Sequence, residues 1–326
     1  MTYKFIDLFA GIGGIRIPFE EYGGECVFSS EWDKFAQQTY AANHGHLPHG
    51  DITQIDPKDI PPFDLLLAGF PCQPFSHAGL KKGFDDTRGT LFFDIARIIA
   101  HHTPKVVFLE NVKGLVGHDK GRTFQTIVRV LEEDLGYKVH YKVHNAKEFG
   151  VPQNRERIYI VALRDHDDFE FLPPPSPETR LGDILELNSK VDSKYTISDR
   201  IWASHQARKA AHIERGNGFG YSLFSRNSKY TSTISARYYK DGSEILIEQK
   251  NKNPRKLTPR EAARLQGFPE NFVIPVSDGQ AYKQFGNSVA VPAIRSVAKA
   301  LSPILGGRKR PSSWKPTNNN DKLFEN

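Results

Sequence analysis

The 326-residue sequence contains very little cysteine: only Cys26 and Cys72. Two cysteines cannot build the disulfide framework that stabilises many small secreted domains, so we expect a protein of a reducing compartment. Long hydrophobic runs are also absent, and none approaches the roughly 18–20 apolar residues that a membrane-spanning helix needs. No signal peptide precedes the first strand-like segment, which begins at Tyr3. The sequence therefore predicts a cytoplasmic protein with no membrane partner.

The composition is typical of a globular protein that carries an excess of positive charge. Hydrophobic residues make up 38% of the chain and charged residues 25%, and the net charge is +6. A chain of this length can form one large or two modest domains, each with its own core. The basic balance is compatible with a polyanionic partner. We find no internal repeats.

The segment 69–76 (GFPCQPFS) places a cysteine directly after a predicted buried strand. The apolar run 63–68 is bounded by Pro61-Pro62 and by Gly69, as expected for a strand inside a sheet. Cys72 then lies at the carboxyl edge of that strand, where open α/β sheets bind their ligands. Pro71 stiffens the turn, so Cys72 is a candidate nucleophile. A lone cysteine is more often a small buried hydrophobic residue. Whether Cys72 is a nucleophile therefore depends on the other motifs of the chain.

A glycine-rich turn follows the first predicted strand, residues 3–9, and leads into a helix over residues 15–22. Its glycines, in the segment 11–14, let the backbone approach a ligand closely. Their spacing is not the G-x-G-x-x-G of dinucleotide-binding proteins. The second predicted strand, residues 25–30, ends at Glu31-Trp32. An acidic residue at this position accepts hydrogen bonds from ribose hydroxyls, and a tryptophan offers a flat face to an adenine ring.

Charged residues border two further predicted strands. Glu110 follows the apolar run 105–109, and a doubly wound sheet would place it beside the Cys72 strand. Arg155 and Arg157 come just before the predicted strand 158–163. Because side chains at i and i+2 of a strand share a face, both arginines are predicted to reach one ligand. The residues 91–102 and 123–135 read as helices.

Four of these blocks together resemble the cytosine-5 DNA methyltransferases, in that family's order. They are residues 7–14 (DLFAGIGG), 69–76, 110–112 (ENV) and 153–157 (QNRER). Several blocks in order are far more specific than one motif. The resemblance covers residues 3 to about 300. It implies an α/β fold, a doubly wound and mostly parallel Rossmann-like methyltransferase sheet, with a smaller irregular β-rich target-recognition domain.

The resemblance also implies the chemistry and the residues that perform it. Cys72 would add to C6 of a cytosine that is flipped out of double-stranded DNA, and Glu110, Arg155 and Arg157 would complete the catalytic group. The implied cofactor is S-adenosyl-L-methionine, and no metal is expected. The loop after Cys72, residues 76–90, would close over DNA. The residues implied to bind the cofactor are Phe9, Gly11, Gly13, Gly14, Glu31, Trp32, Asp51, Ile52, Pro71, Asn287 and Ser288.

The composition changes near residue 171, where a proline-rich linker begins (FLPPPSP, residues 171–177). Beyond it, an irregular polar stretch interleaves basic and aromatic residues, as a DNA-reading surface requires. Within it, Asp241-Gly242 before an alternating segment predicts a hairpin. A capping box beginning at Thr258 predicts a helix, and a last helix is predicted over 292–301. The predicted domains are residues 1–170 with 281–305 (catalytic), 171–280 (target recognition) and 306–326 (a disordered tail).

Three rival functions differ in the residues they require. A nicotinamide-dependent dehydrogenase would have no use for Cys72 beside Glu110 and paired arginines. A tRNA cytosine-5 methyltransferase shares the chemistry, but an insertion of roughly 80 residues after the linker favours duplex DNA. A non-catalytic paralogue would not need the four catalytic residues. A cognate restriction endonuclease and a monomeric state are further expectations. The histidines at 44, 46 and 49 are predicted to be a solvated loop and not a metal site.

Overall fold

The computed structural model describes residues 2–71, 91–165 and 168–307. Cys72 and the segment 76–90 lie outside the described residues, as does most of the predicted tail. The chain divides into two compact units. The first comprises residues 1–144, 156–173 and 293–326, and the second comprises residues 145–155 and 174–292. The roles predicted for residues 1–170 with 281–305 and for residues 171–280 remain predictions.

A six-stranded sheet forms the centre of the first unit, with the strand order β2-β1-β3-β4-β6-β5. The four neighbours β2, β1, β3 and β4 run parallel, and β6 runs antiparallel to β4. Residues 63–68 and 105–109 were predicted as strands, and β3 and β4 are found there. The strand bounds are β1 Tyr3–Leu8, β2 Gly24–Ser30, β3 Leu65–Gly69, β4 Val106–Val112, β5 Lys138–Asn145 and β6 Glu156–Leu163.

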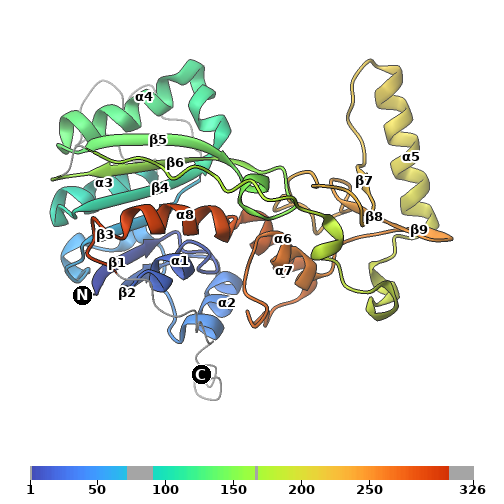
Figure 1. The fold of residues 1–326 in the computed structure, drawn as a ribbon, viewed down its shortest axis with the longest axis horizontal. Coiled ribbons are helices and arrows are strands. Elements are labelled where there is room, and N and C mark those ends of the chain that lie inside the picture. Colours follow the sequence, from blue (N-terminus) through green and yellow to red (C-terminus); the bar gives the residue numbers. More distant parts are fainter. Residues whose placement is uncertain (1, 72–90, 166–167, 308–326) are drawn as a thin grey trace. The chain divides into compact units, whose positions relative to one another are not determined.

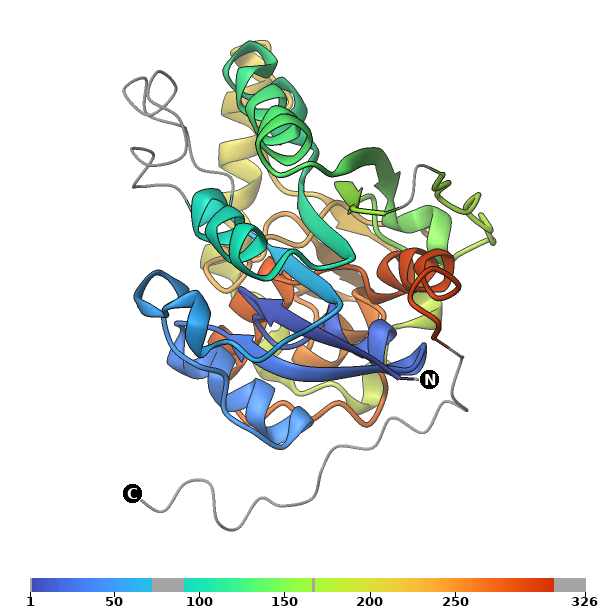
Figure 2. The same cartoon turned by 90° about the vertical axis from the view of Figure 1, so that its left-hand side faces the viewer.

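Helices cover both faces of this sheet, which confirms the predicted doubly wound arrangement (Figure 1). On one face, Phe19 of α1 packs against Phe5 and Phe108 of the strands. Arg295 of α8 pairs with Glu21 of α1 on this same side. Figure 2 shows α3 and α8 on opposite sides of the strands. The helix bounds are α1 Arg16–Glu21, α2 Lys34–His44, α3 Leu91–His102, α4 Arg122–Arg129 and α8 Val291–Leu301.

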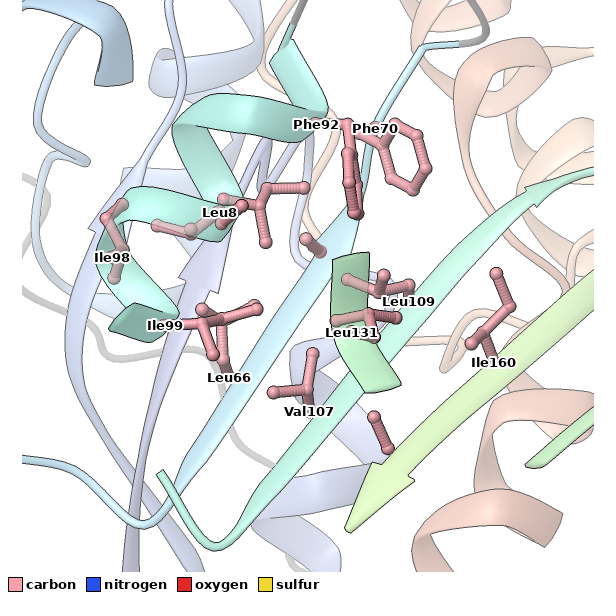
Figure 3. Close-up of a cluster of buried hydrophobic side chains, with 14 of the residues drawn as sticks. Leu8, Leu66, Phe70, Phe92, Ile98, Ile99, Val107, Leu109, Leu131 and Ile160 are labelled. Atoms are coloured by element: carbon pink, nitrogen blue, oxygen red, sulfur yellow. The ribbon is translucent and has the colours of Figure 1, made fainter. Parts of the chain in front are cut away.

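The core on the α3 side consists of aliphatic and aromatic side chains from strands and helices (Figure 3). In Figure 3, Leu8 of β1 lies beside Ile98 of α3, Leu66 of β3 lies beside Ile99, and Leu109 of β4 lies beside Leu131. Burying a side chain of this size contributes about 1.5–3 kcal/mol each to folding. The α3 apolar residues recur at helical spacing, which is why residues 91–102 could be predicted as a helix.

The strand order creates a switch point between β1 and β3. The chain leaves β1 through α1 to reach β2 on one side, then crosses through α2 to reach β3 on the other side. Connections that diverge in this way leave a crevice at the carboxyl edge of the sheet, which is where such folds bind ligands. The turn after β1 and the segment after β3 are therefore the places to look for a site.

The second unit has more helix than the sequence predicted. Its helices are α5 Asp199–Glu214, α6 Pro259–Leu265 and α7 Asp278–Asn287. Its small sheet contains β7 Leu223–Phe224, β8 Leu246–Gln249 and β9 Lys252–Arg255. The hairpin predicted at Asp241-Gly242 is wrong, because β8 runs parallel to β7 and turns back into β9 at residues 250–251.

Among the described residues, no helix is both long enough and apolar enough to cross a membrane.

Short helical turns connect these elements. The 3-10 segments are Ile52–Gln54, Pro57–Asp59, Lys113–Gly121, Ala146–Phe149, Leu181–Asp183, Asn188–Lys190 and Ser193–Tyr195, and a π-helical turn spans Val130–Asp134.

The capping box predicted at the start of α6 is confirmed. The Thr258 hydroxyl accepts a hydrogen bond from the Glu261 N–H at 3.1 Å, and the Glu261 carboxylate accepts one from the Thr258 N–H at 2.9 Å. Glu261 also receives both terminal nitrogens of Arg255, at 2.7 and 2.8 Å, and both side chains are buried. Buried charges of this kind are tolerated only when they are paired.

Candidate active site

The turn after β1 adopts a backbone that requires glycine. Gly11 has φ +56° and Gly13 has φ +83°, in the left-handed region that residues with a Cβ rarely adopt. A Cβ added to Gly13 would lie 2.0 Å from Nε2 of His44. The turn is tied to β2 by the Ala10 N–H, which donates to the Ser30 carbonyl at 3.0 Å. The turn therefore presents backbone closely to whatever binds at this edge.

Glu31, at the end of β2, connects this turn to the start of α2. One carboxylate oxygen accepts the Gly11 N–H and the other accepts the Asp33 N–H, both at 2.8 Å. Only 8% of Glu31 is exposed, and burial raises the pKa of its carboxyl. A carboxylate has about four acceptor sites, so Glu31 can still accept from a ligand hydroxyl. The neighbouring Trp32 is 78% exposed, so its ring is accessible.

The segment that carries Asp51 is held against the end of β2. The Glu31 N–H donates to the His49 carbonyl at 2.8 Å, and the Ser30 hydroxyl donates to the Gly50 carbonyl at 3.1 Å. Asp51 is exposed and accepts the Thr53 N–H at 3.0 Å, whereas Ile52 is buried in the core. The structure thus brings Gly11, Glu31 and Asp51 to one edge of the sheet.

The predicted solvated histidine loop is wrong for His44. This residue is the last of α2 and is buried, and burial lowers the pKa of its imidazole well below the usual value. His46 contacts the Arg16 guanidinium at 3.3 Å and the Ser29 hydroxyl at 3.2 Å. Among the described residues no cluster of side chains suited to holding a metal occurs.

Glu110 lies inside β4, two residues before the last residue of the strand, and not after the strand as predicted. It is opposite Gly69 of β3 in the parallel register. A Cβ on Gly69 would lie 3.5 Å from a carboxylate oxygen of Glu110. Arg157 of β6 places its Nε 3.2 Å from the other oxygen, and the two side chains are only 14% and 10% exposed. An acid and a guanidinium therefore meet beside the strand that leads to Cys72.

Asn111 is a site residue that the sequence reasoning did not single out. Its side chain is buried and donates to the Phe70 carbonyl at 2.8 Å, while its own oxygen accepts the Val112 N–H. Asn111 thereby fixes the backbone two residues before Cys72. The signal was available, because Asn111 is the middle residue of the 110–112 block.

Arg155 and Arg157 do not act as an i, i+2 pair on one strand. β6 begins at Glu156, so Arg155 precedes it. Arg157 pairs with Glu110, whereas the Arg155 guanidinium donates to the carbonyls of Ile234, Gly286 and Ser288. Their partners differ because the ladder that orients alternating side chains starts only after Arg155.

The remaining predicted residues are found in separate places. Asn287 is exposed and ends α7, and Ser288 follows it in the second unit. Pro71 is exposed directly after Phe70, and Phe9 packs on the core with φ +54°. Cys72 lies outside the described residues.

These features define a class: a doubly wound α/β protein with a glycine-turn ligand site after β1 and an acid–guanidinium pair beside β3. The family model of the C-5 cytosine-specific DNA methylase matches residues 3–303. The chain belongs to the C-5 cytosine-specific DNA methylase family. It is a DNA (cytosine-5-)-methyltransferase, and its cofactor is S-adenosylmethionine.

Curated relatives and solved structures agree with this family. The chain is 64% identical over 309 residues to Type II methyltransferase M.SsoII of Shigella sonnei, covering 93% of this chain and 81% of the relative. It is 49% identical over 323 residues to Type II methyltransferase M.HpaII of Haemophilus parainfluenzae, covering 93% and 90%. The fold resembles the S. pombe Dnmt2 methyltransferase, with TM-score 0.75 at 21% identity and coverage of 93% and 99%.

Proposed function

We propose that the protein transfers a methyl group to C5 of a flipped cytosine within a short specific duplex DNA sequence, through covalent attack of Cys72 on C6. The observation that carries this proposal is the Glu110–Arg157 pair at 3.2 Å beside Gly69, three residues before Cys72. Cytosine C5 is a poor nucleophile until a thiolate adds to C6, and a nearby acid and guanidinium make that addition easier.

Cys72 is the better of the two candidate nucleophiles. Burial raises the pKa of the Cys26 thiol to about 12, so almost none of it is thiolate near neutral pH. The Cys26 thiol also contacts the carbonyl of Phe28, at 3.4 Å, within the first unit. Cys72 instead follows the exposed Pro71 at the carboxyl edge of β3. A cysteine at that edge can meet a ligand, because this is the open side of the sheet.

In the proposed reaction, the Cys72 sulfur forms a bond to C6 and the ring electrons move to C5. Glu110 hydrogen-bonds N3, and Arg157 hydrogen-bonds O2, so that the charge arriving on the ring is stabilised. Asn111 holds the backbone before Cys72 in place. After C5 has gained the methyl group, a base removes the C5 proton and the C6–sulfur bond breaks, which frees Cys72. S-adenosylmethionine, when bound, supplies an electrophilic methyl group on its sulfonium.

The turn after β1 and the end of β2 fit an adenosine-bearing cofactor. Gly11 has open space where a Cβ would go, so a ligand can approach the backbone there, and Gly13 lets the turn pack on His44. Glu31 can accept from ribose hydroxyls, Trp32 can cover the adenine, and Asp51 can accept from the exocyclic amine. We assign Phe9, Gly14, Ile52 and Pro71 to the same site, and Asn287 and Ser288 to the methionine end.

Duplex DNA is the proposed substrate in preference to tRNA. The support is the family, which is that of the C-5 cytosine-specific DNA methylase, and the relatives at 64% and 49% identity, which are named Type II methyltransferases. The second unit carries exposed aromatic residues such as Phe219, Tyr230 and Tyr239, suited to contact with nucleic acid. We further propose a monomer in the cytoplasm, with a cognate endonuclease that cuts the same site.

The test is methyl transfer from radiolabelled S-adenosylmethionine to duplex DNA and to tRNA. Wild type and Cys26→Ser are expected to label duplex DNA, and Cys72→Ser is expected to label neither substrate. Sequencing of 5-methylcytosine in the labelled DNA then identifies the site. Labelling of tRNA alone would replace the DNA proposal, and activity retained by Cys72→Ser would overturn the assigned nucleophile.

A further inference from the structure

Arg155 is one of the most deeply buried charged residues of the second unit, with 2% of its surface exposed. Its guanidinium donates to the carbonyls of Ile234 and Gly286, each at 3.1 Å, and to the carbonyl of Ser288. A guanidinium presents its N–H donors as a rigid planar fork. Arg155 therefore fixes the distance between residue 234 and the end of α7.

The segment around Ile234 is also fastened from its other side. The Ile234 N–H donates to the side-chain oxygen of Gln153 at 3.1 Å, and Gln153 is completely buried. The Gln153 amide nitrogen in turn donates to the Leu265 carbonyl at 3.2 Å and to the side-chain oxygen of Gln266 at 3.1 Å. Both backbone groups of Ile234 are thus held by side chains from the segment 153–155.

Further hydrogen bonds run along the same contact. The Thr231 N–H donates to the Pro152 carbonyl at 2.8 Å, the Asn154 N–H donates to the Thr231 carbonyl at 2.9 Å, and the Thr233 hydroxyl donates to the Asn154 carbonyl at 2.6 Å. Residues 231–235, which we call the 231–235 segment, are therefore held by hydrogen bonds to residues 152–155. This segment leads directly into the exposed residues Arg237, Tyr239 and Lys240.

The end of α7 is packed against the 231–235 segment without an intervening side chain. A Cβ on Gly286 would lie 2.2 Å from the Ser235 carbonyl oxygen. Gly286 also supplies a carbonyl of the last turn of α7, which has no partner within the helix and carries the negative end of its dipole, and Ser288 follows the helix. The Arg155 charge stabilises the carbonyls of both residues, and these residues flank Asn287.

We propose that Arg155 is a positioning residue that couples DNA-sequence recognition to cofactor binding. The inference rests on the proposed function, in which the second unit reads DNA and Asn287 and Ser288 bind the cofactor. DNA that binds the exposed residues 237–240 restrains the 231–235 segment and the Ile234 carbonyl that Arg155 holds. The same guanidinium then holds Ser288 more firmly in place. Coupling of this kind is reciprocal, so each ligand changes the affinity for the other by the same factor.

The experiment measures the dissociation constant of S-adenosylhomocysteine by calorimetry, with and without a duplex that contains the methylated site. In wild type, the duplex is expected to tighten binding at least fivefold. In Arg155→Lys, which keeps the charge but loses the fork, the ratio is expected to fall below twofold. Arg264→Lys is the matched control, because Arg264 pairs with the exposed Glu270 in the same unit.

Arg157→Lys separates positioning from contact with the base. It is expected to lower kcat at least tenfold while the coupling ratio stays at the wild-type value. The proposal is overturned if wild type shows no coupling, or if Arg155→Lys keeps the ratio and loses kcat as Arg157→Lys does. Should Arg155→Lys fail to fold by circular dichroism, Thr233→Val tests the same contact, and an unchanged ratio there contradicts the proposal. Failure of the proposed function can be told apart from failure of the coupling proposal, because the wild-type protein would then not methylate duplex DNA.

Discussion

Gly13 shows how one missing side chain shapes the ligand edge. Its φ of +83° and the 2.0 Å separation between a would-be Cβ and His44 leave no freedom at this position. Gly11 provides a close comparison, because it also has positive φ but has open space where a Cβ would go. A comparison of alanine substitutions at the two glycines therefore separates the effect of backbone strain from the effect of steric overlap.

We predict that Gly13→Ala destabilises the protein more than Gly11→Ala. A left-handed alanine costs roughly 1–2 kcal/mol in either place, and Gly13→Ala adds the displacement of the buried His44. Urea unfolding measures the stability, and calorimetry with S-adenosylhomocysteine measures cofactor binding. Equal effects of the two substitutions would show that His44 does not restrict the turn.

Residue-level prediction from the sequence succeeded where a side chain acts close to its own strand. Glu31 and Glu110 were placed at the sheet edge because a predicted strand ends directly before each of them, and Asp51 was placed by the family resemblance. The pairing of Arg155 with Arg157 failed, because it depended on where β6 begins. The three carbonyl partners of Arg155 are distant in the chain, at residues 234, 286 and 288, so no local pattern could indicate them.

At the scale of the element, α6 is held by a capping box and by a buried ion pair. Thr258 and Pro259 mark its start in the sequence, which is why this short helix could be predicted. Its Glu261 serves the cap, the Arg255 ion pair and the Glu186 N–H at 2.9 Å. Removing this carboxylate would leave a buried guanidinium without its partner.

Glu261→Gln is accordingly expected to destabilise the protein by about 3–5 kcal/mol, the usual cost of breaking a buried ion pair. Glu270→Gln, which breaks an exposed pair with Arg264, should cost less than about 1 kcal/mol. Chemical denaturation of both variants gives the comparison. A cost below about 1 kcal/mol for Glu261→Gln would show that Arg255 finds other partners.

Two helices of the second unit escaped sequence prediction for different reasons. α5 has a single buried residue, His205, so it carries no apolar stripe with helical period. α7 contains Gly279, Gly286 and Asn287, residues that usually mark turns. The hairpin error at Asp241-Gly242 has a similar origin, because the Asp241 carboxylate accepts from Ser243 and Arg208 in a turn that joins no strand pair.

At the scale of the whole molecule, the pH dependence of stability should reflect buried histidines. His144 of β5 is packed between Tyr159 and Phe171, and burial together with the Lys142 charge lowers its pKa from 6.5 to about 4. Between pH 6.5 and 4 the unfolded chain therefore binds a proton that the folded protein does not. Stability rises with pH wherever the unfolded state binds more protons.

The folded protein should thus lose stability as pH falls from about 6.5 to 4, and His144→Gln should reduce that loss. Thermal unfolding across this pH range measures it, with His101→Gln as the exposed control. A pH profile of the His144 variant identical to that of wild type would exclude His144 as a source of the acid sensitivity.

The central claim, that Cys72 bonds transiently to cytosine C6, is tested most directly by trapping. The protein is incubated with S-adenosylmethionine and duplex DNA that carries 5-fluorocytosine at the methylated position. Fluorine at C5 blocks the proton removal that releases the enzyme, so a covalent protein–DNA complex should accumulate and survive denaturing electrophoresis. Cys26→Ser should trap as wild type does and Cys72→Ser should not. A wild-type protein that methylates ordinary duplex DNA but forms no Cys72-dependent complex would contradict the account.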